Sequence, residues 1–249
     1  MRGVVMQKLF KQVVGSVGLA MLALGVVHAG IANTKHNLSS SGTGSVISSG
    51  AEATTEICLF CHTPHMNQDK SDVIPLWNHT VSTATYTMYT SSTFDGSGTV
   101  QQIGDGSLTP ATATVTNLCL SCHDGTVAIS SLYNQSNMST GGNTNPTMDT
   151  SVSQLNASGM LIGGTGALGT DLSNDHPVNF TYDAALVALD TTLHDPSSLN
   201  GVQLYGGKVQ CASCHEPHVD YTTGTDTARS PFLRLPITGS VLCLECHNK

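Results

Sequence analysis

The stretch CLFCHTPH, residues 58–65, holds two cysteines and two histidines within eight positions. Its first five residues follow the pattern C-x-x-C-H, with Cys58 and Cys61 one helical turn apart and His62 directly after them. This pattern is typical of c-type haem attachment, because two thiols at that spacing form thioethers with one porphyrin and the adjacent imidazole binds the iron. The second histidine, His65, is not explained by this motif and needs a reason of its own.

The same five-residue pattern occurs four times and uses every cysteine of the chain. Disulfides would leave the histidine after each pair unexplained, and zinc sites would not need so regular a histidine in four widely separated places. A thioredoxin-like motif would occur once, within a βαβ pattern. We therefore predict four covalently bound haem c groups, with the cysteines as thioether positions and the histidines as proximal iron ligands. The four groups are Cys58, Cys61 and His62; Cys119, Cys122 and His123; Cys211, Cys214 and His215; and Cys243, Cys246 and His247.

The N-terminus has the pattern of a secretory signal peptide. Basic residues up to Lys11 precede an uncharged apolar stretch at 13–27, and small residues then favour cleavage after Ala29. A membrane anchor is the weaker interpretation, because a spanning helix needs about 20 apolar residues. We expect an exported protein, extracellular or on the cell surface, with the periplasm as the alternative and without stable membrane insertion.

Composition after residue 29 narrows the class of protein further. The whole chain has only five Phe, six Tyr and one Trp, so we expect the haems to supply much of the apolar interior. All 17 acidic side chains follow residue 29, against six basic ones, which gives a formal net charge of −11. Nucleic-acid binding requires basic patches, so the composition argues against it.

Six further histidines follow residue 29 and can complete the coordination of four irons. Enough are present for two histidines at every iron, which would leave no open position for a substrate. We expect His176 first, then His36 and His79, to act as distal ligands, because all three lie in loop-like surroundings. His194 precedes Asp195 and a proline, and we expect it at the surface.

His65 and His218 are distal candidates of a special kind, because each lies three residues after a proximal histidine. Residues three apart on a helix or tight turn share a face, whereas two axial ligands must approach one iron from opposite faces. His65 is therefore expected to bind a haem other than that of His62, and His218 a haem other than that of His215. The alternative is a surface histidine at a turn ended by proline.

An internal repeat organises the chain. A C-x-x-C-H-x-P-H motif followed by a plain C-x-x-C-H motif occurs twice, and Gly-, Ser- and Thr-rich sequence separates the two units. We expect mostly coil, short helices at the haem motifs and a few short β-strands, organised around closely packed haems. The best helix candidate is 181–193, and the Thr-rich stretch 82–100 favours short strands. We divide the chain into a signal peptide (1–29), a first haem-pair unit (30–133), a linker or insert (134–174) and a second haem-pair unit (175–249).

With these motifs in place, the chain resembles the multihaem c-type cytochromes with doubled C-x-x-C-H motifs. The paired motifs together with KHNLS, PLWNH and DHPVNF are similar to those of OmcE-type tetrahaem cytochromes, which polymerise into extracellular filaments called nanowires. The resemblance covers most of the chain after residue 29, although 134–174 carries no matching motif. It implies bis-histidine haems, identical subunits as partners and one iron ligand that crosses a subunit boundary.

These observations together predict an electron carrier rather than an enzyme. Electrons would pass between closely spaced haems toward redox partner proteins or extracellular acceptors such as metal oxides. A monomeric periplasmic shuttle with the same four haems is the main alternative, and a multihaem reductase is a second one.

Overall fold

Irregular backbone connects short helices and strands in the computed structural model, which describes residues 30–63, 76–103, 114–137 and 142–248. This coil-rich architecture confirms the expectation of mostly coil, and short helices contain or overlap the second, third and fourth C-x-x-C-H motifs. The α-helices are α2 (Val115–His123), α3 (Ala184–Leu189), α4 (Cys211–Cys214) and α5 (Val241–Leu244), and the 3₁₀ helices are Gly30–Asn33, Asp95–Thr99, Pro196–Ser198, Gly224–Arg229 and Thr238–Ser240.

Helix α2 is the longest helix of the described chain and contains the second motif. Thr114 and Asn117 form a capping box at its start, in which each side chain accepts a hydrogen bond from the other residue's backbone N–H. Such caps satisfy backbone donors that the first turn leaves without partners. The helix buries Leu120 and Ser121, which are the two residues between its cysteines.

Helix α3 is shorter than the predicted segment 181–193. Thr181 belongs to strand β3, so the helix begins only after Asp183, whose side chain accepts a hydrogen bond from the Leu186 N–H. At the other end the Asp190 carboxylate accepts bonds from both the backbone N–H and the hydroxyl of Thr192. This local alternative to helical hydrogen bonding ends the helix.

Two small antiparallel sheets contain all the strands of the described residues. Strand β1 (Ser136–Asn137) pairs with β2 (Gly142–Asn143), and β3 (Phe180–Thr181) pairs with β4 (Lys208–Val209). The expectation of short strands in 82–100 is wrong: this segment has one isolated bridge, from Thr87 to Asp171, and otherwise irregular backbone apart from the 3₁₀ turn. Hydroxyl contacts such as those of Ser82 and Ser91 with nearby backbone N–H groups compete with strand pairing here.

Three small apolar clusters take the place of one large core, and each adjoins a haem motif. The first includes Leu120 of the second motif, the second packs against Cys61 and Cys122, and the third packs against Cys246. Segment 142–174 contributes to the first two clusters. The buried members are Tyr86, Met88, Ile103, Leu120 and Leu172; Phe60, Ile129, Met148 and Leu155; and Phe180, Tyr182, Leu186 and Val209.

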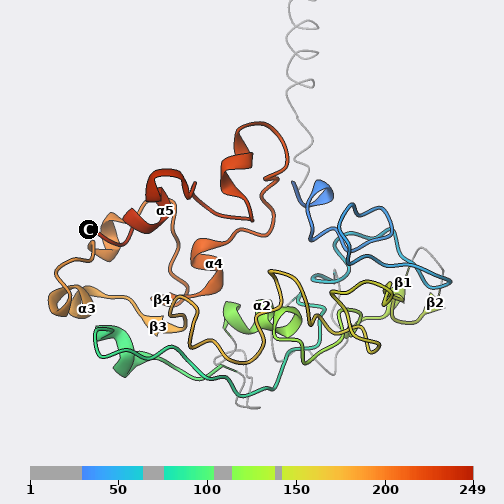
Figure 1. Cartoon of the computed structure of the whole chain (residues 1–249), viewed down its shortest axis with the longest axis horizontal. Helices are drawn as coiled ribbons and strands as arrows, with labels where there is room; N and C mark the ends of the chain where they lie inside the picture. Colours follow the sequence, from blue (N-terminus) through green and yellow to red (C-terminus); the bar gives the residue numbers. More distant parts are fainter. Residues whose placement is uncertain (1–29, 64–75, 104–113, 138–141, 249) are drawn as a thin grey trace, which may run out of the picture.

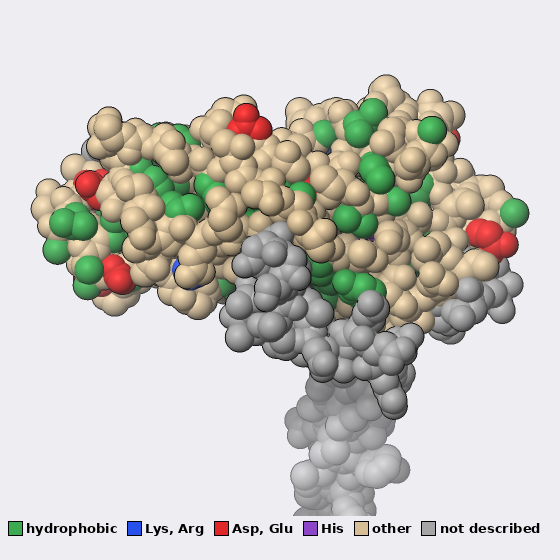
Figure 2. Space-filling view, turned by 90° about the horizontal axis from the view of Figure 1, so that it is seen from below, with side chains coloured by type: hydrophobic (Ala, Val, Ile, Leu, Met, Phe, Trp, Pro, Cys, Tyr) green, Lys and Arg blue, Asp and Glu red, His purple; other side chains and the backbone are tan. Residues whose placement is uncertain are grey.

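The molecule is elongated, and the motif-bearing helices are spread along it. Figure 1 shows α2 and α4 near the middle, α3 and α5 toward one end, and β1 and β2 toward the other. In the face drawn in Figure 2, acidic side chains are scattered and hydrophobic ones form several separate groups. Within the described residues no helix is both long and apolar enough to cross a membrane. The signal peptide predicted at 1–29 lies outside the described residues.

Candidate haem sites

Each C-x-x-C-H motif folds as a single helical turn. The backbone N–H of His62 donates to the carbonyl of Cys58 at 2.8 Å, and the third and fourth motifs repeat this bond at 3.0 Å from His215 and His247. The second motif lies within α2 and has the same helical register. This turn places the two thiols of a motif on one face with the histidine next to them, which is the arrangement that attachment of one porphyrin requires.

Consecutive motifs lie against each other through their cysteines. The thiols of Cys119 and Cys211 are close enough to interact electrostatically, as are those of Cys61 with Cys122 and of Cys214 with Cys246. The contact between α2 and α4 is reinforced by Gln210, whose side-chain oxygen accepts bonds from both the N–H and the hydroxyl of Thr116. The spatial order of the motifs is therefore the order of the sequence.

All eight cysteines are free thiols. Burial raises the pKa of Cys61 and of Cys122 to about 12 and that of Cys214 to about 11, so these side chains remain protonated at neutral pH. Zinc is bound by deprotonated thiolates grouped with other ligands. Within the part of the chain that the structure describes, no three His, Cys, Asp or Glu side chains gather as such a site would require.

His36 faces His123 across the centre of the molecule. Their ring centroids are 6.0 Å apart and the ring planes are inclined by 61°, while the other face of His36 stacks on Phe232 at 4.1 Å. Burial, and then the neighbouring histidines, lowers the pKa of His36 to about 4, which keeps the ring neutral and able to bind a metal. The Nδ1–H of His123 donates to the Gly166 carbonyl at 2.6 Å, which leaves its Nε2 without a proton.

His62 and His218 form a second pair of neighbouring rings. Their centroids are 6.2 Å apart and their planes differ by only 16°. The two residues belong to different halves of the internal repeat, so His218 stands beside the proximal histidine of another motif rather than that of its own. This is the arrangement expected from the spacing of His218 after His215.

The distances within both pairs fit a shared iron. Two imidazoles on opposite sides of one metal place their ring centres roughly 6 Å apart, from two metal–nitrogen bonds of about 2 Å and the two ring radii. Two buried N–H donors also lack acceptors within the described residues: Trp77 Nε1, whose ring lies beside His62, and Asn117 Nδ2, two residues before Cys119. Haem propionates carry acceptors of the kind that such donors need. The residues present therefore fit haem c.

The remaining distal candidates lie elsewhere. His65 is outside the described residues. His79 is fully buried, and its two ring nitrogens face the carbonyls of Thr80 and Ala128 at 2.8 and 3.1 Å, a placement typical of a structural histidine. His176 is exposed, with its Nδ1 at 2.9 Å from the carbonyl of Pro177, and the structure does not bring its ring against a proximal histidine.

His194 does not lie free at the surface as the sequence suggested. It is half-buried against the fourth motif, where its backbone N–H donates to the Cys246 carbonyl at 2.8 Å and its Nδ1 to that of Glu245 at 3.2 Å. The neighbouring Leu193 forms an isolated bridge with His247. The sequence HDP gave no signal for this contact, because it depends on residues about fifty positions later.

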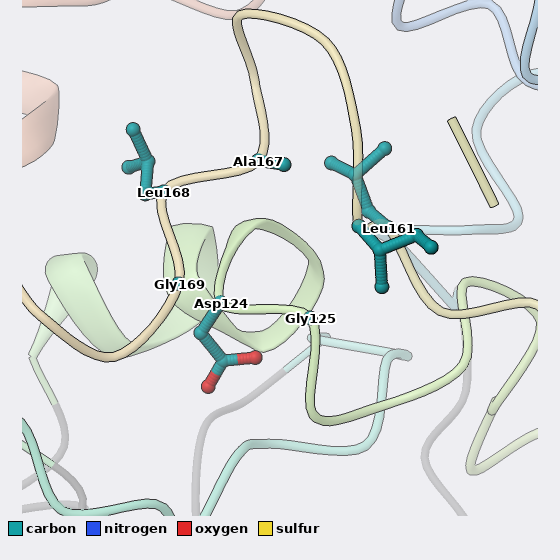
Figure 3. A pocket seen from close by; sticks show the side chains of 7 residues that line it. Asp124, Gly125, Leu161, Ala167, Leu168 and Gly169 are labelled. Carbon is teal, nitrogen blue, oxygen red and sulfur yellow. The ribbon is translucent and has the colours of Figure 1, made fainter. Parts of the chain in front are cut away.

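Gly166 is a second residue that the sequence did not single out. Segment 161–169 passes across the C-terminal end of α2, and Figure 3 shows Leu161, Ala167 and Leu168 around Asp124 there. A Cβ at Gly166 would lie 3.3 Å from His123 Nδ1, so a side chain would crowd the ring that the Gly166 carbonyl holds. The sequence shows that this segment is Gly-rich, but it does not show that the segment contacts His123.

Comparison with known proteins adds no family assignment: no protein-family model matches the chain, and no curated protein matches it significantly.

Proposed function

We propose that this protein is an exported tetrahaem c-type cytochrome that transfers electrons through bis-histidine haems as the subunit of an extracellular conducting filament. The observation that carries this proposal is the pairing of His62 with His218 and of His123 with His36. In each pair a motif histidine faces an imidazole from outside its own motif, at the distance that one shared iron needs. These pairs add to the fourfold cysteine pattern a feature that disulfides would not explain.

The chain's own residues divide the work of binding and spacing. The cysteines of each turn attach a haem, and His62, His123, His215 and His247 are the proximal ligands. When bound, haem c supplies a ferric–ferrous couple at each motif. Contacts such as Cys119 with Cys211 hold neighbouring attachment points together, so that four consecutive haems would lie close enough for electrons to pass along the molecule.

Assembly of identical subunits is supported by apolar side chains near the fourth motif. Leu189, Ile237, Val241 and Leu244 are exposed at this end of the described chain. A subunit contact that repeats without closing produces an open filament. A haem chain that reaches this end would then continue into the next subunit, toward redox partner proteins or extracellular acceptors such as metal oxides.

Haem content tests the core of the proposal. The purified protein is expected to show four covalent haems per chain by pyridine haemochrome assay and intact mass. Its ferric spectrum should be low-spin and insensitive to nitrite and carbon monoxide, because two histidines occupy each iron. A colourless protein would overturn the haem assignment, and a haem that binds these ligands in the native protein would favour a reductase.

Imaging of the secreted protein tests the filament. Filaments of regular helical repeat are expected in the medium and on the cell surface. Compact particles at all protein concentrations would contradict assembly and favour the monomeric periplasmic shuttle with the same four haems.

A further inference from the structure

A carboxylate stands behind the imidazole of His218. Glu216 Oε1 accepts a hydrogen bond from the ring Nδ1–H of His218 at 2.9 Å and another from its backbone N–H at 3.2 Å. The Nδ1 atom is therefore the protonated one, and Nε2 carries the lone pair available to a metal. The hydrogen bond of the ring nitrogen that does not face the proposed iron is thus made to an acidic side chain two residues earlier in the chain.

Arg234 fixes this carboxylate in place. One of its terminal nitrogens lies 3.1 Å from Glu216 Oε2, and the same nitrogen donates to the Tyr205 hydroxyl at 2.7 Å. Its Nε donates to the carbonyl of Ala212, between the cysteines of the third motif, at 2.7 Å. The ion pair with Arg234 therefore holds the Glu216 carboxylate beside the His218 ring.

The His36–His123 pair is held by different partners. The Nδ1–H of His123 donates to a backbone carbonyl, that of Gly166, and His36 is held by stacking on Phe232. The Nδ1–H of His215 likewise donates to the backbone carbonyl of Pro231, at 3.1 Å. A carboxylate makes a stronger, charge-assisted hydrogen bond than a neutral carbonyl, and it increases the electron density of the imidazole more.

We propose that Glu216 is a positioning residue that makes the iron between His62 and His218 harder to reduce than the iron between His36 and His123. An electron-rich imidazole stabilises the ferric form, which lowers the reduction potential. This inference rests on the haem function proposed above and adds a direction to it. Electrons that enter at the first motif pass energetically downhill to the second.

The two pairs carry separate spectroscopic labels because their ring planes differ. In a low-spin ferric haem, near-parallel imidazole planes give a rhombic electron paramagnetic resonance signal, and steeply inclined planes give a signal with a larger maximal g value. The planes differ by 16° in the His62–His218 pair and by 61° in the His36–His123 pair. The potential of each iron can therefore be followed in the intact protein.

The test is a redox titration of the haem-loaded full chain, monitored by this resonance, for the native protein and for Glu216→Gln. In the native protein the rhombic signal should disappear at the lower potential of the two. The substitution should shift its ferric–ferrous equilibrium toward the ferrous form by up to about tenfold, equivalent to 59 mV for one electron, and leave the inclined signal in place. Asp149→Asn, at an exposed carboxylate that bonds only its own turn, is the matched charge control and should move neither signal.

Equal shifts of both signals, or no shift of the rhombic one, would overturn the role of Glu216. If the Gln variant does not fold, Glu216→Asp tests the same bond, because the shorter carboxylate retreats from Nδ1; it should shift the rhombic signal the same way by less, and an unshifted signal would again refute the proposal. A native protein with no covalent haem would instead refute the proposed function. Four haems with an unmoved rhombic signal would refute only this inference.

Discussion

The second and fourth motifs, LCLSCH and LCLECH, differ by one residue in sequence and strongly in environment. Leu120 of the second motif is 1% exposed, whereas Leu244 at the same position of the fourth motif is 41% exposed. The second motif lies in a capped nine-residue helix that packs on α4. The fourth begins after Ser240 in a left-handed conformation without a side-chain cap, in a four-residue helix. The described chain thus encloses its central motif and leaves the terminal one partly exposed.

Removal of a cysteine pair should produce the largest difference between the second and the fourth motif. Cys119→Ala with Cys122→Ala and Cys243→Ala with Cys246→Ala should each reduce the haem content by one. The central loss should also destabilise the remaining structure, because these cysteines lie in α2, which packs on α4 and is joined to it by the bonds of Thr116 to Gln210. Haem assay and thermal unfolding measure both effects. Equal losses of stability in the two variants would show that the centre is not specially enclosed.

Truncation of the matched leucines should give the next largest difference. Leu120→Ala leaves a cavity in a buried cluster and should cost about 2–5 kcal/mol of unfolding free energy. Leu244→Ala removes an exposed side chain and should cost within about 0.5 kcal/mol in the monomer. Denaturant unfolding of the haem-loaded proteins compares them. A large loss of unfolding free energy in Leu244→Ala would mean that the haem proposed for the fourth motif covers this side chain within the subunit.

Loss of a distal ligand should have a local effect. His36→Ala removes the ring that faces His123, so one haem of four should become high-spin and bind carbon monoxide. Lys35→Ala, at the exposed neighbouring residue, is the control and should remain fully low-spin. Visible and resonance spectra measure the change. Four low-spin haems in the His36 variant would exclude it as a ligand.

Substitutions of the exposed apolar side chains of α5 should have the smallest effect on the fold and a selective effect on assembly. Val241→Ser with Leu244→Ser should leave the haem content at four and hardly change stability, because both side chains are more than 40% exposed. Filament formation should be lost if this surface is the subunit contact. Electron microscopy and sedimentation provide the measurement, and intact filaments would place the contact elsewhere.

Local spacing accounts for what could be predicted about the site. The turn of each motif depends on residues three and four apart, so the sequence predicted it. That His218 serves an iron other than that of His215 stays a prediction, although its ring does lie beside that of His62. The facing of His36 and His123 could not be predicted, because 87 residues of sequence separate them and the contact depends on Phe232. The sequence CHEPH contains Glu216, the carboxylate that contacts His218, but Arg234, which fixes this carboxylate, lies eighteen positions after it.

Secondary structure was predictable in kind and less so in extent. Helix α3 was located correctly and is shorter than expected, since the Asp190 carboxylate accepts hydrogen bonds from the backbone N–H and the hydroxyl of Thr192, where the predicted helix would have continued. The strands expected in 82–100 failed because threonine favours strands only where a partner strand is present, and here the pairing is limited to one bridge.

The turn that brings two thiols and an imidazole together is determined by the sequence, because it needs nothing beyond the spacing of these residues, and the haem attachment that we propose rests on the same spacing. The burial of the motifs and the pairing of the histidine rings are determined only by the tertiary structure. Leu120 and Leu244 stand at the same position of two motifs that differ by one residue. Their burial differs because of the surroundings of their helices: α2 packs on α4 through Thr116 and Gln210, which lie 94 residues apart. The free energy of burying a side chain comes from whatever covers it, and for most of these residues that cover comes from distant parts of the chain.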